Sequence, residues 1–208
     1  MTKNISIIDY DIGNILSVKR SVEILGFKTH VTKEKDKILN SDKIILPGVG
    51  AFKNGMNLLK KHNLIEVIRE AAENKKSILG ICLGMQLFFD ESFEFGQTKG
   101  LGLIKGKVEK IIIDDNDKSL KVPSIGWNEL IVKKKNKILS GIKNKVSTYF
   151  VHSYMASPED KSVITSVYKF GNKEIVASVN LENIYGCQFH PEKSGKIGLE
   201  ILNNFILS

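Results

Sequence analysis

The chain of 208 residues is poor in cysteine, proline and tryptophan, with 2, 4 and 1 of them. Two cysteines provide neither a disulfide framework nor the ligand spacing of a metal site, so we expect reduced thiols and no metal or other cofactor. Long apolar runs are also missing: none approaches the length of a membrane span, and the apolar stretch near the first residue is too short for a signal peptide. These absences predict a cytoplasmic protein.

Acidic residues are fewer than basic ones, 23 against 31, which gives a formal charge of +8. The lysines are scattered apart from the run at 133–135, and no helix-turn-helix, zinc-finger or ribonucleoprotein motif accompanies them. Scattered lysines are typical of a solvated surface, although a basic face can attract an anionic metabolite or an acidic subunit. We therefore expect no nucleic-acid partner and no membrane partner. Salt-sensitive retention on DNA would be the test of the first alternative.

Repeats, linkers and low-complexity tracts are absent too, which predicts one domain over residues 1–208. The first half alternates short apolar runs, which predict strands, with helical periods. The expected strands are 5–10, 27–31, 42–47 and 76–82, and the expected helices run from Asn14 to Gly26, over 51–61 and over 64–74. This alternation predicts a parallel sheet covered by helices on both faces.

The second half predicts strands without intervening helices. They are expected at 102–113, 127–134, 146–156, 162–170 and 173–182, and a helix over 195–207 follows them. The predicted fold class is therefore α/β: a mixed, mostly parallel central sheet with helices on both faces and an antiparallel strand extension. In open parallel sheets, ligands bind at the carboxyl ends of the strands, and Cys82 lies at such an end.

The segment GICLG, residues 80–84, has the form G-x-C-x-G, the cysteine version of a nucleophile elbow. Small residues two positions to either side of the cysteine let the backbone double back closely. The thiol would face the first turn of the next helix, whose free N–H groups favour a thiolate. The N–H of Leu83 could donate to an oxyanion. A small buried cysteine between two glycines explains the pattern equally well.

A nucleophilic cysteine needs a base, and the chain has four histidines. His30 lies in a predicted strand and His62 at a polar helix end, so we expect neither to act on Cys82. His190, in QFHPEK, ends a strand at a turn, and Glu192 lies two residues on, on the same face of an extended chain. The three residues form a candidate triad of nucleophile, base and orienting acid. A surface loop is the alternative for the histidine turn.

A glycine-flanked loop follows another predicted strand. In LPGVGAF, residues 46–52, two glycines stand on either side of Val49. Such a loop allows main-chain N–H groups to approach a ligand closely, as an oxyanion site requires. An ordinary turn between a strand and a helix would explain the two glycines as well.

Taken in order, PGVGAF, GICLGMQLFF and QFHPEKSG resemble the oxyanion segment, nucleophile elbow and His/Glu turn of the class I, triad-type glutamine amidotransferases. Three further stretches resemble the branch of this family that serves histidine biosynthesis: IDYDIGNILSV (8–18), VPSIGWNEL (122–130) and YFVHSY (149–154). The resemblance runs from about residue 5 to the last residue, and it implies the family's flavodoxin-like fold.

The resemblance also implies a role for each matching residue. Cys82 attacks the side-chain amide of glutamine and forms a glutamyl thioester, His190 passes a proton to the departing ammonia, and Glu192 orients His190. The implied oxyanion positions are Gly50 and Leu83, and the implied glutamine-binding positions are Gly48, Gln86, Glu94, Ser153 and Tyr154.

The family branch implies a second chain as well. A cyclase subunit of the (β/α)8-barrel type would form a heterodimer with this chain and use the ammonia to make imidazole glycerol phosphate and aminoimidazole carboxamide ribotide. Free ammonia is mostly protonated at neutral pH, so its delivery through a dry passage makes chemical sense. The implied interface positions are Asn14, Trp127, Tyr149 and Lys193.

Two positions depart from the family pattern: Asp11 stands where glycine is usual, and Ser124 stands where His or Gln is common. Both are expected near the partner-facing side, so they bear on which cyclase is served. One alternative is therefore a paralogous subunit that supplies ammonia for amidination of a surface sugar. A non-catalytic glutamine-binding module is disfavoured because all three triad residues are present. A stand-alone peptide hydrolase is disfavoured because nothing indicates an extended substrate groove.

Overall fold

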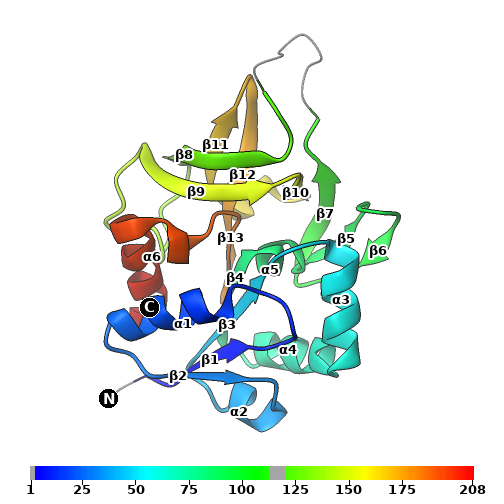
Figure 1. The fold of residues 1–208 in the computed structure, drawn as a ribbon, viewed down its shortest axis with the longest axis vertical. Coiled ribbons are helices and arrows are strands. Elements are labelled where there is room, and N and C mark those ends of the chain that lie inside the picture. Colours follow the sequence, from blue (N-terminus) through cyan, green and yellow to red (C-terminus); the bar gives the residue numbers. More distant parts are fainter. Residues whose placement is uncertain (1–2, 113–119) are drawn as a thin grey trace.

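The computed structural model describes residues 3–112 and 120–208. Within them, nine strands form a sheet of order β2-β1-β3-β4-β13-β12-β11-β8-β9 (Figure 1). Their bounds are β1 Ile5–Ile8, β2 Thr29–Thr32, β3 Lys43–Gly48, β4 Ser77–Cys82, β8 Ser124–Val132, β9 Val146–His152, β11 Ile164–Phe170, β12 Lys173–Leu181 and β13 Ile184–Cys187. Neighbours from β2 to β13 are parallel, and neighbours from β13 to β9 are antiparallel. The predicted α/β class, a parallel part with an antiparallel extension, is confirmed.

A second sheet of four strands has the order β10-β7-β5-β6. Its strands are β5 Phe89–Ser92, β6 Thr98–Lys99, β7 Ile104–Lys110 and β10 Tyr154–Pro158. The helices are α1 Ile15–Ile24, α2 Lys35–Leu39, α3 Phe52–Lys61, α4 Leu64–Glu73, α5 Leu83–Gln86 and α6 Gly195–Leu207, with short 3-10 turns η1 Lys161–Val163 and η2 Pro191–Lys193. In the parts of the chain that the structure describes, no helix is long and apolar enough to cross a membrane.

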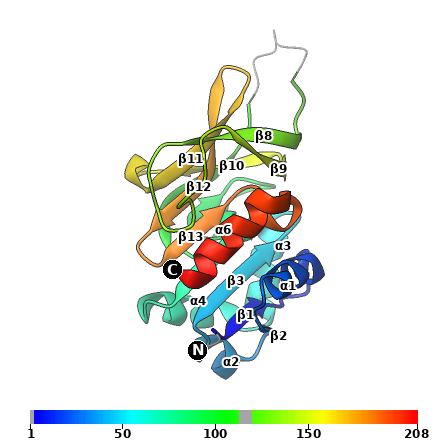
Figure 2. The same ribbon diagram turned by 90° about the vertical axis from the view of Figure 1, so that its left-hand side faces the viewer.

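Helices cover both faces of the large sheet at β1, β3 and β4, whose residues are mostly apolar and buried on both sides. Ile45 of β3 points into one core cluster with α1 and α6, which lie side by side in Figure 2. Its neighbours Ile44 and Leu46 point into the opposite cluster, with α3 and α4. Because successive side chains of a strand point to opposite faces, β3 contributes to two cores, one on each side of the sheet.

Most expected elements exist close to their expected bounds, and α6 matches its predicted range. Three differ. The strand expected over 146–156 is two strands, β9 and β10, that belong to different sheets. The strand expected over 127–134 begins earlier, at Ser124, and the strand expected over 102–113 is β7, with residue 113 outside the described ranges. Helix α2 and strands β5 and β6 were not predicted, since each is five residues or shorter and has little room for a period.

Candidate active site

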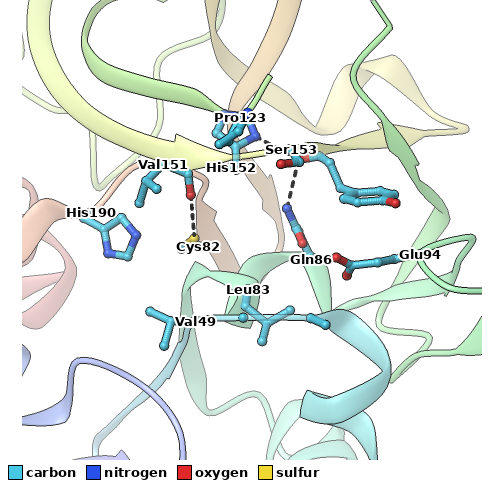
Figure 3. Close-up of a pocket in the computed structure, with 13 residues that line it drawn as sticks. Val49, Cys82, Leu83, Gln86, Glu94, Pro123, Val151, His152, Ser153 and His190 are labelled. Atoms are coloured by element: carbon cyan, nitrogen blue, oxygen red, sulfur yellow. Dashed lines mark hydrogen bonds between the residues drawn. The ribbon is translucent and has the colours of Figure 1, made fainter. Parts of the chain in front are cut away.

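A cavity of about 370 Å³ lies at the carboxyl ends of β3 and β4 (Figure 3). Four segments meet there: the glycine loop (residues 46–52), the cysteine turn (80–84), the junction of β9 and β10, and the histidine turn (188–193). The lining residues are Val49, Gly50, Ala51, Cys82, Leu83, Gln86, Glu94, Pro123, Val151, His152, Ser153, Tyr154 and His190. Segments far apart in the sequence therefore build one site.

Cys82 ends β4 with φ 55° and ψ −110°, a conformation that is uncommon for a residue with a side chain. The glycines two positions before and after Cys82 lie so close to other backbone atoms that a side chain would not fit there. A Cβ at Gly80 would lie 2.6 Å from the Met85 nitrogen, and a Cβ at Gly84 would lie 1.9 Å from the Leu46 oxygen. The backbone therefore doubles back as GICLG predicts. The helix that follows, α5, is only one turn long.

The Cys82 sulfur is mostly enclosed, with the residue 7% exposed. It accepts a hydrogen bond from Gln188 Nε2 at 3.7 Å and lies 4.0 Å from the Val151 oxygen. His190 lines the same cavity, and its Nε2 is buried without a hydrogen-bond partner in the described residues. A nitrogen in that state is available for proton transfer.

His190 and Glu192 form a buried pair. Nδ1 of His190 donates to Glu192 Oε1 at 2.8 Å, and the two side chains are 2% and 0% exposed. Burial lowers the pKa of His190, but the neighbouring Cys82 and Glu192 outweigh burial and raise it to about 10. With its pKa raised, the imidazole carries a proton on both nitrogens at neutral pH: Glu192 holds the proton on Nδ1, and Nε2 carries the one that can be transferred.

Backbone contacts fix the turn that carries this pair. The His190 N–H donates to the Tyr149 oxygen at 2.9 Å, and Ser194 Oγ donates to the His190 oxygen at 2.6 Å. Asn14 Nδ2 donates to Glu192 Oε1 at 3.3 Å. Asn14, expected at the partner interface, therefore also contacts the candidate triad.

A hydrogen bond holds the backbone at each end of the glycine loop. At one end, Tyr10 Oη donates to the Pro47 oxygen at 2.7 Å; burial and the Cys82 charge raise the pKa of Tyr10, so it stays a donor. At the other end, the Phe52 N–H that begins α3 donates to Glu94 Oε2 at 2.7 Å. Between these anchors Gly50 has φ +90° and would meet nothing within 4 Å of an added Cβ. The loop backbone has room to change conformation there.

The predicted glutamine-binding residues are brought together, with one exception. Gln86, Glu94, Ser153 and Tyr154 line the cavity. Gly48 lies beneath it, where a Cβ would be 2.5 Å from Tyr10 Oη. Gln86 Nε2 donates to the Tyr154 oxygen at 3.0 Å and to Gln188 Oε1 at 2.9 Å, which leaves the Gln86 carbonyl oxygen for a ligand.

The other expected interface residues surround the histidine turn but do not line the cavity. Trp127, 57% exposed, pairs across β8 and β9 with Tyr149, and their ring centroids are 6.0 Å apart. Lys193 Nζ lies 5.7 Å from the Tyr149 ring, which lies 6.5 Å from the His190 ring. An exposed aromatic face thus adjoins the candidate base.

The two departures from the family pattern have different surroundings. Asp11 has φ 70°, in the region that favours glycine, and its carboxylate accepts hydrogen bonds from His62 at 2.7 Å and Lys61 at 3.2 Å. These two bonds hold the pKa of Asp11 below its usual value. Ser124 lies on the strand of Trp127, but its side chain is buried beside Tyr168 and does not face a partner.

His152 and Gln188 are among the residues at the site that were not predicted. His152 is buried, with Nδ1 donating to the Tyr154 oxygen at 2.8 Å and Nε2 lying 2.8 Å from Tyr168 Oη. Gln188 reaches the sulfur, and this contact joins positions 106 apart, so no local pattern signals it. No group of three or more His, Cys, Asp or Glu side chains in the described ranges is placed to hold a metal ion.

Comparison with known proteins agrees with this geometry. The family model for class-I glutamine amidotransferase matches residues 6–208. Imidazole glycerol phosphate synthase subunit HisH of Pelagibacter ubique is 49% identical over 98% of this chain and 99% of its own length. HisH of Aquifex aeolicus is 44% identical over 96% and 94%.

Among solved structures, PurLQS from Thermotoga maritima has a TM-score of 0.72 at 22% identity, over 100% of this chain and 99% of that one. At that identity the match supports the fold alone, whereas the family resemblance of the motifs is confirmed by the sequence relatives. The chain therefore belongs to the class-I glutamine amidotransferase family and, within it, to the HisH subunits of imidazole glycerol phosphate synthase.

Proposed function

We propose that this chain is the glutaminase subunit of imidazole glycerol phosphate synthase, and that Cys82, His190 and Glu192 are its catalytic triad. It hydrolyses L-glutamine to glutamate and ammonia for histidine biosynthesis. The observation that carries the proposal is a mostly enclosed Cys82 on a strained turn, in one cavity with a His190 that is itself bonded to Glu192.

The reaction follows from these positions. The Cys82 thiol passes its proton to Nε2 of His190, the sulfur attacks the amide carbon of glutamine, and the carbonyl oxygen gains the negative charge. His190 gives its proton to the leaving nitrogen, so ammonia departs and a glutamyl thioester remains. Water then attacks the thioester carbon, His190 takes the proton of that water, and the carbon–sulfur bond breaks to release glutamate. Glu192 keeps the imidazole in the tautomer that presents Nε2.

Main-chain N–H groups at Gly50 and Leu83 stabilise the oxyanion in this proposal. The glutamine itself is held by Gln86, Glu94, Ser153 and Tyr154, above Gly48. Because the loop between the Pro47 and Phe52 anchors has room around Gly50, docking of the partner is what arranges it for catalysis. The isolated chain is therefore nearly inactive.

The partner in this proposal is a cyclase subunit of the (β/α)8-barrel type that forms a heterodimer with the chain in the cytoplasm. It docks on the face made by Asn14, Trp127, Tyr149 and Lys193, takes up the ammonia and makes imidazole glycerol phosphate and aminoimidazole carboxamide ribotide. Exposed aromatic residues are frequent anchors of such interfaces. Residues 1–208 act as one glutamine amidotransferase domain.

The test is glutamate release from glutamine by this chain mixed with the histidine-pathway cyclase of the same organism, with and without the imidazole ribonucleotide. We expect strong stimulation by the cyclase and the ribonucleotide. Cys82→Ala should abolish turnover while its circular dichroism and unfolding stay close to those of the original chain. Cys187→Ala, which removes a buried thiol outside the cavity, should retain turnover and serves as the matched control.

Retained turnover in Cys82→Ala would contradict the triad. Absence of stimulation, with the cyclase shown to use added ammonia, would instead assign the chain to a sugar-amidinating partner.

A further inference from the structure

Gln188 lies behind the nucleophile and has no part in the triad mechanism. It follows β13, is fully buried, and its backbone N–H donates to the Ala177 oxygen at 2.8 Å. Its side chain does not line the glutamine cavity. It nevertheless reaches the Cys82 sulfur, at 3.7 Å from Nε2.

The orientation of the Gln188 amide follows from its neighbours. The Tyr154 oxygen can only accept, so Gln86 must turn its NH₂ group toward it, at 3.0 Å. The same NH₂ group donates to Gln188 Oε1 at 2.9 Å. With its oxygen engaged by Gln86, Gln188 can present only its own NH₂ group to the sulfur. A backbone carbonyl therefore fixes, through two side chains, a donor that points at the nucleophile.

We propose that Gln188 is a catalytic residue that donates an N–H to the Cys82 thiolate and so keeps the sulfur ionised and aimed at the amide carbon. The sulfur needs such a donor because it is mostly enclosed and has few water contacts. The sulfur also lies 4.0 Å from the backbone oxygen of Val151. That oxygen can accept a hydrogen bond from a thiol, but it has no hydrogen to donate to a thiolate. The donor also assists the last step, in which the sulfur leaves the acyl carbon as an anion.

The test measures alkylation of Cys82 by iodoacetamide between pH 5 and 9, on the full chain without partner or glutamine. Peptide mass spectrometry separates Cys82 from Cys187. A hydrogen bond to a charged group is worth about a tenfold effect or more. We expect Gln188→Leu to lower the alkylation rate at pH 7 about tenfold and to move the pH of half-maximal rate upward.

Gln188→Glu is a second variant that keeps the size of the side chain and the oxygen that accepts from Gln86. It removes the donor and places a carboxylate beside the sulfur, so its alkylation rate should fall by more than that of Gln188→Leu. If Gln188 merely supported Gln86, Gln188→Leu would be alkylated like the original chain, because the change would act on Gln86 and not on the sulfur, and the proposal would be overturned.

Ser178→Ala is the matched control. The substitution removes a buried hydroxyl from β12. Ser178 pairs with Cys187, the residue before Gln188, and its hydroxyl bonds to Thr165 and not to the Cys82 sulfur. Its alkylation should be unchanged, so a loss seen there would mark a general effect of loosening this sheet. His190 and Tyr10 are the titratable groups that interact with Cys82, and all three variants retain them.

The catalytic part of this inference rests on the proposed function, whereas the effect on the thiol needs no substrate. Glutamate release with the cyclase is therefore measured in parallel. In Gln188→Glu, kcat should fall at least tenfold with little change in KM, because Gln86 keeps its partner. If the original chain hydrolyses glutamine but alkylation is within twofold in both variants, this inference fails. If alkylation falls but no form hydrolyses glutamine, the proposed function fails instead.

Discussion

The buried imidazole of His152 should make the protein lose stability in mild acid. Burial lowers its pKa from 6.5 to about 4, and the nearby His190 adds to this, against the opposing bond to the Tyr154 oxygen. The unfolded chain therefore binds this proton near pH 6.5, and the folded chain only near pH 4. The stabilisation is complete above pH 6.5 and is lost as the pH falls to 4. A difference of about 2.5 units at about 1.36 kcal/mol each gives about 3 kcal/mol.

His190 acts in the opposite direction and in another window. Its pKa in the folded chain is raised to about 10. The stability it contributes is therefore present below pH 6.5 and is lost as the pH rises through 10. Most of its contribution is already present at pH 7, and it cancels when two forms that both retain His190 are compared, so that comparison isolates the effect of His152.

Urea unfolding of the original chain and of His152→Gln at pH 7 and pH 4 measures the effect. The variant is less stable at pH 7 because it loses the fitted bonds to Tyr154 and Tyr168. That deficit should shrink by about 3 kcal/mol at pH 4, since only the original chain must protonate a buried imidazole. The carboxylates titrate in the original chain and in the variant alike, so their effect on the free energy of unfolding cancels in the comparison. His30→Gln, at an exposed histidine on β2, should show the same deficit at both pH values; equal deficits for His152→Gln would refute the reasoning.

Three further outcomes are expected. Gly84→Ala should destabilise the chain by about 1–3 kcal/mol in urea, because its Cβ would lie 1.9 Å from the Leu46 oxygen; unchanged stability would mean that the elbow relaxes freely. Lys193→Ala should weaken stimulation by the cyclase more than it raises KM for glutamine, and an equal loss without the cyclase would contradict its interface role. Cys187, fully buried with a pKa raised by that burial, should react with a thiol reagent only as fast as the chain unfolds.

Elements with a clear period could be predicted from local sequence, whereas the assignment of strands to sheets could not. Helix α6 was predicted because apolar side chains recur along Gly195–Leu207, and this face packs into the core with β4 and β13. The stretch 146–156 reads as one strand because nothing local marks Ser153 as a break. After it, Tyr154 pairs with Lys110 in the other sheet. That pairing partner lies more than forty residues away and has no local signature.

The same limit applies within the site. His190 and Glu192 were paired from their separation of two residues, but the extended chain assumed for that pairing is wrong, since Glu192 lies in the 3-10 turn η2 that begins after His190. The contact between Gln188 and Cys82 joins positions 106 apart and exists only because β13 lies beside β4 in the sheet. His152 could not be distinguished from an ordinary core histidine until its ring was seen to hold the Tyr154 oxygen.

Glu94 and Asn14, which the family pattern assigns to glutamine binding and to the partner interface, each also form a hydrogen bond within the proposed catalytic machinery. Glu94, expected to hold glutamine, accepts from the first N–H of α3 and so anchors one end of the glycine loop. Asn14, expected at the interface, donates to Glu192. A partner that docks on the proposed face would therefore contact a residue bonded to the triad acid, and a glutamine that engages Glu94 would contact the anchor of the oxyanion loop. These two hydrogen bonds would link a docked partner to the proposed triad and a bound glutamine to the proposed oxyanion loop, which gives a physical reason to expect activity that depends on both.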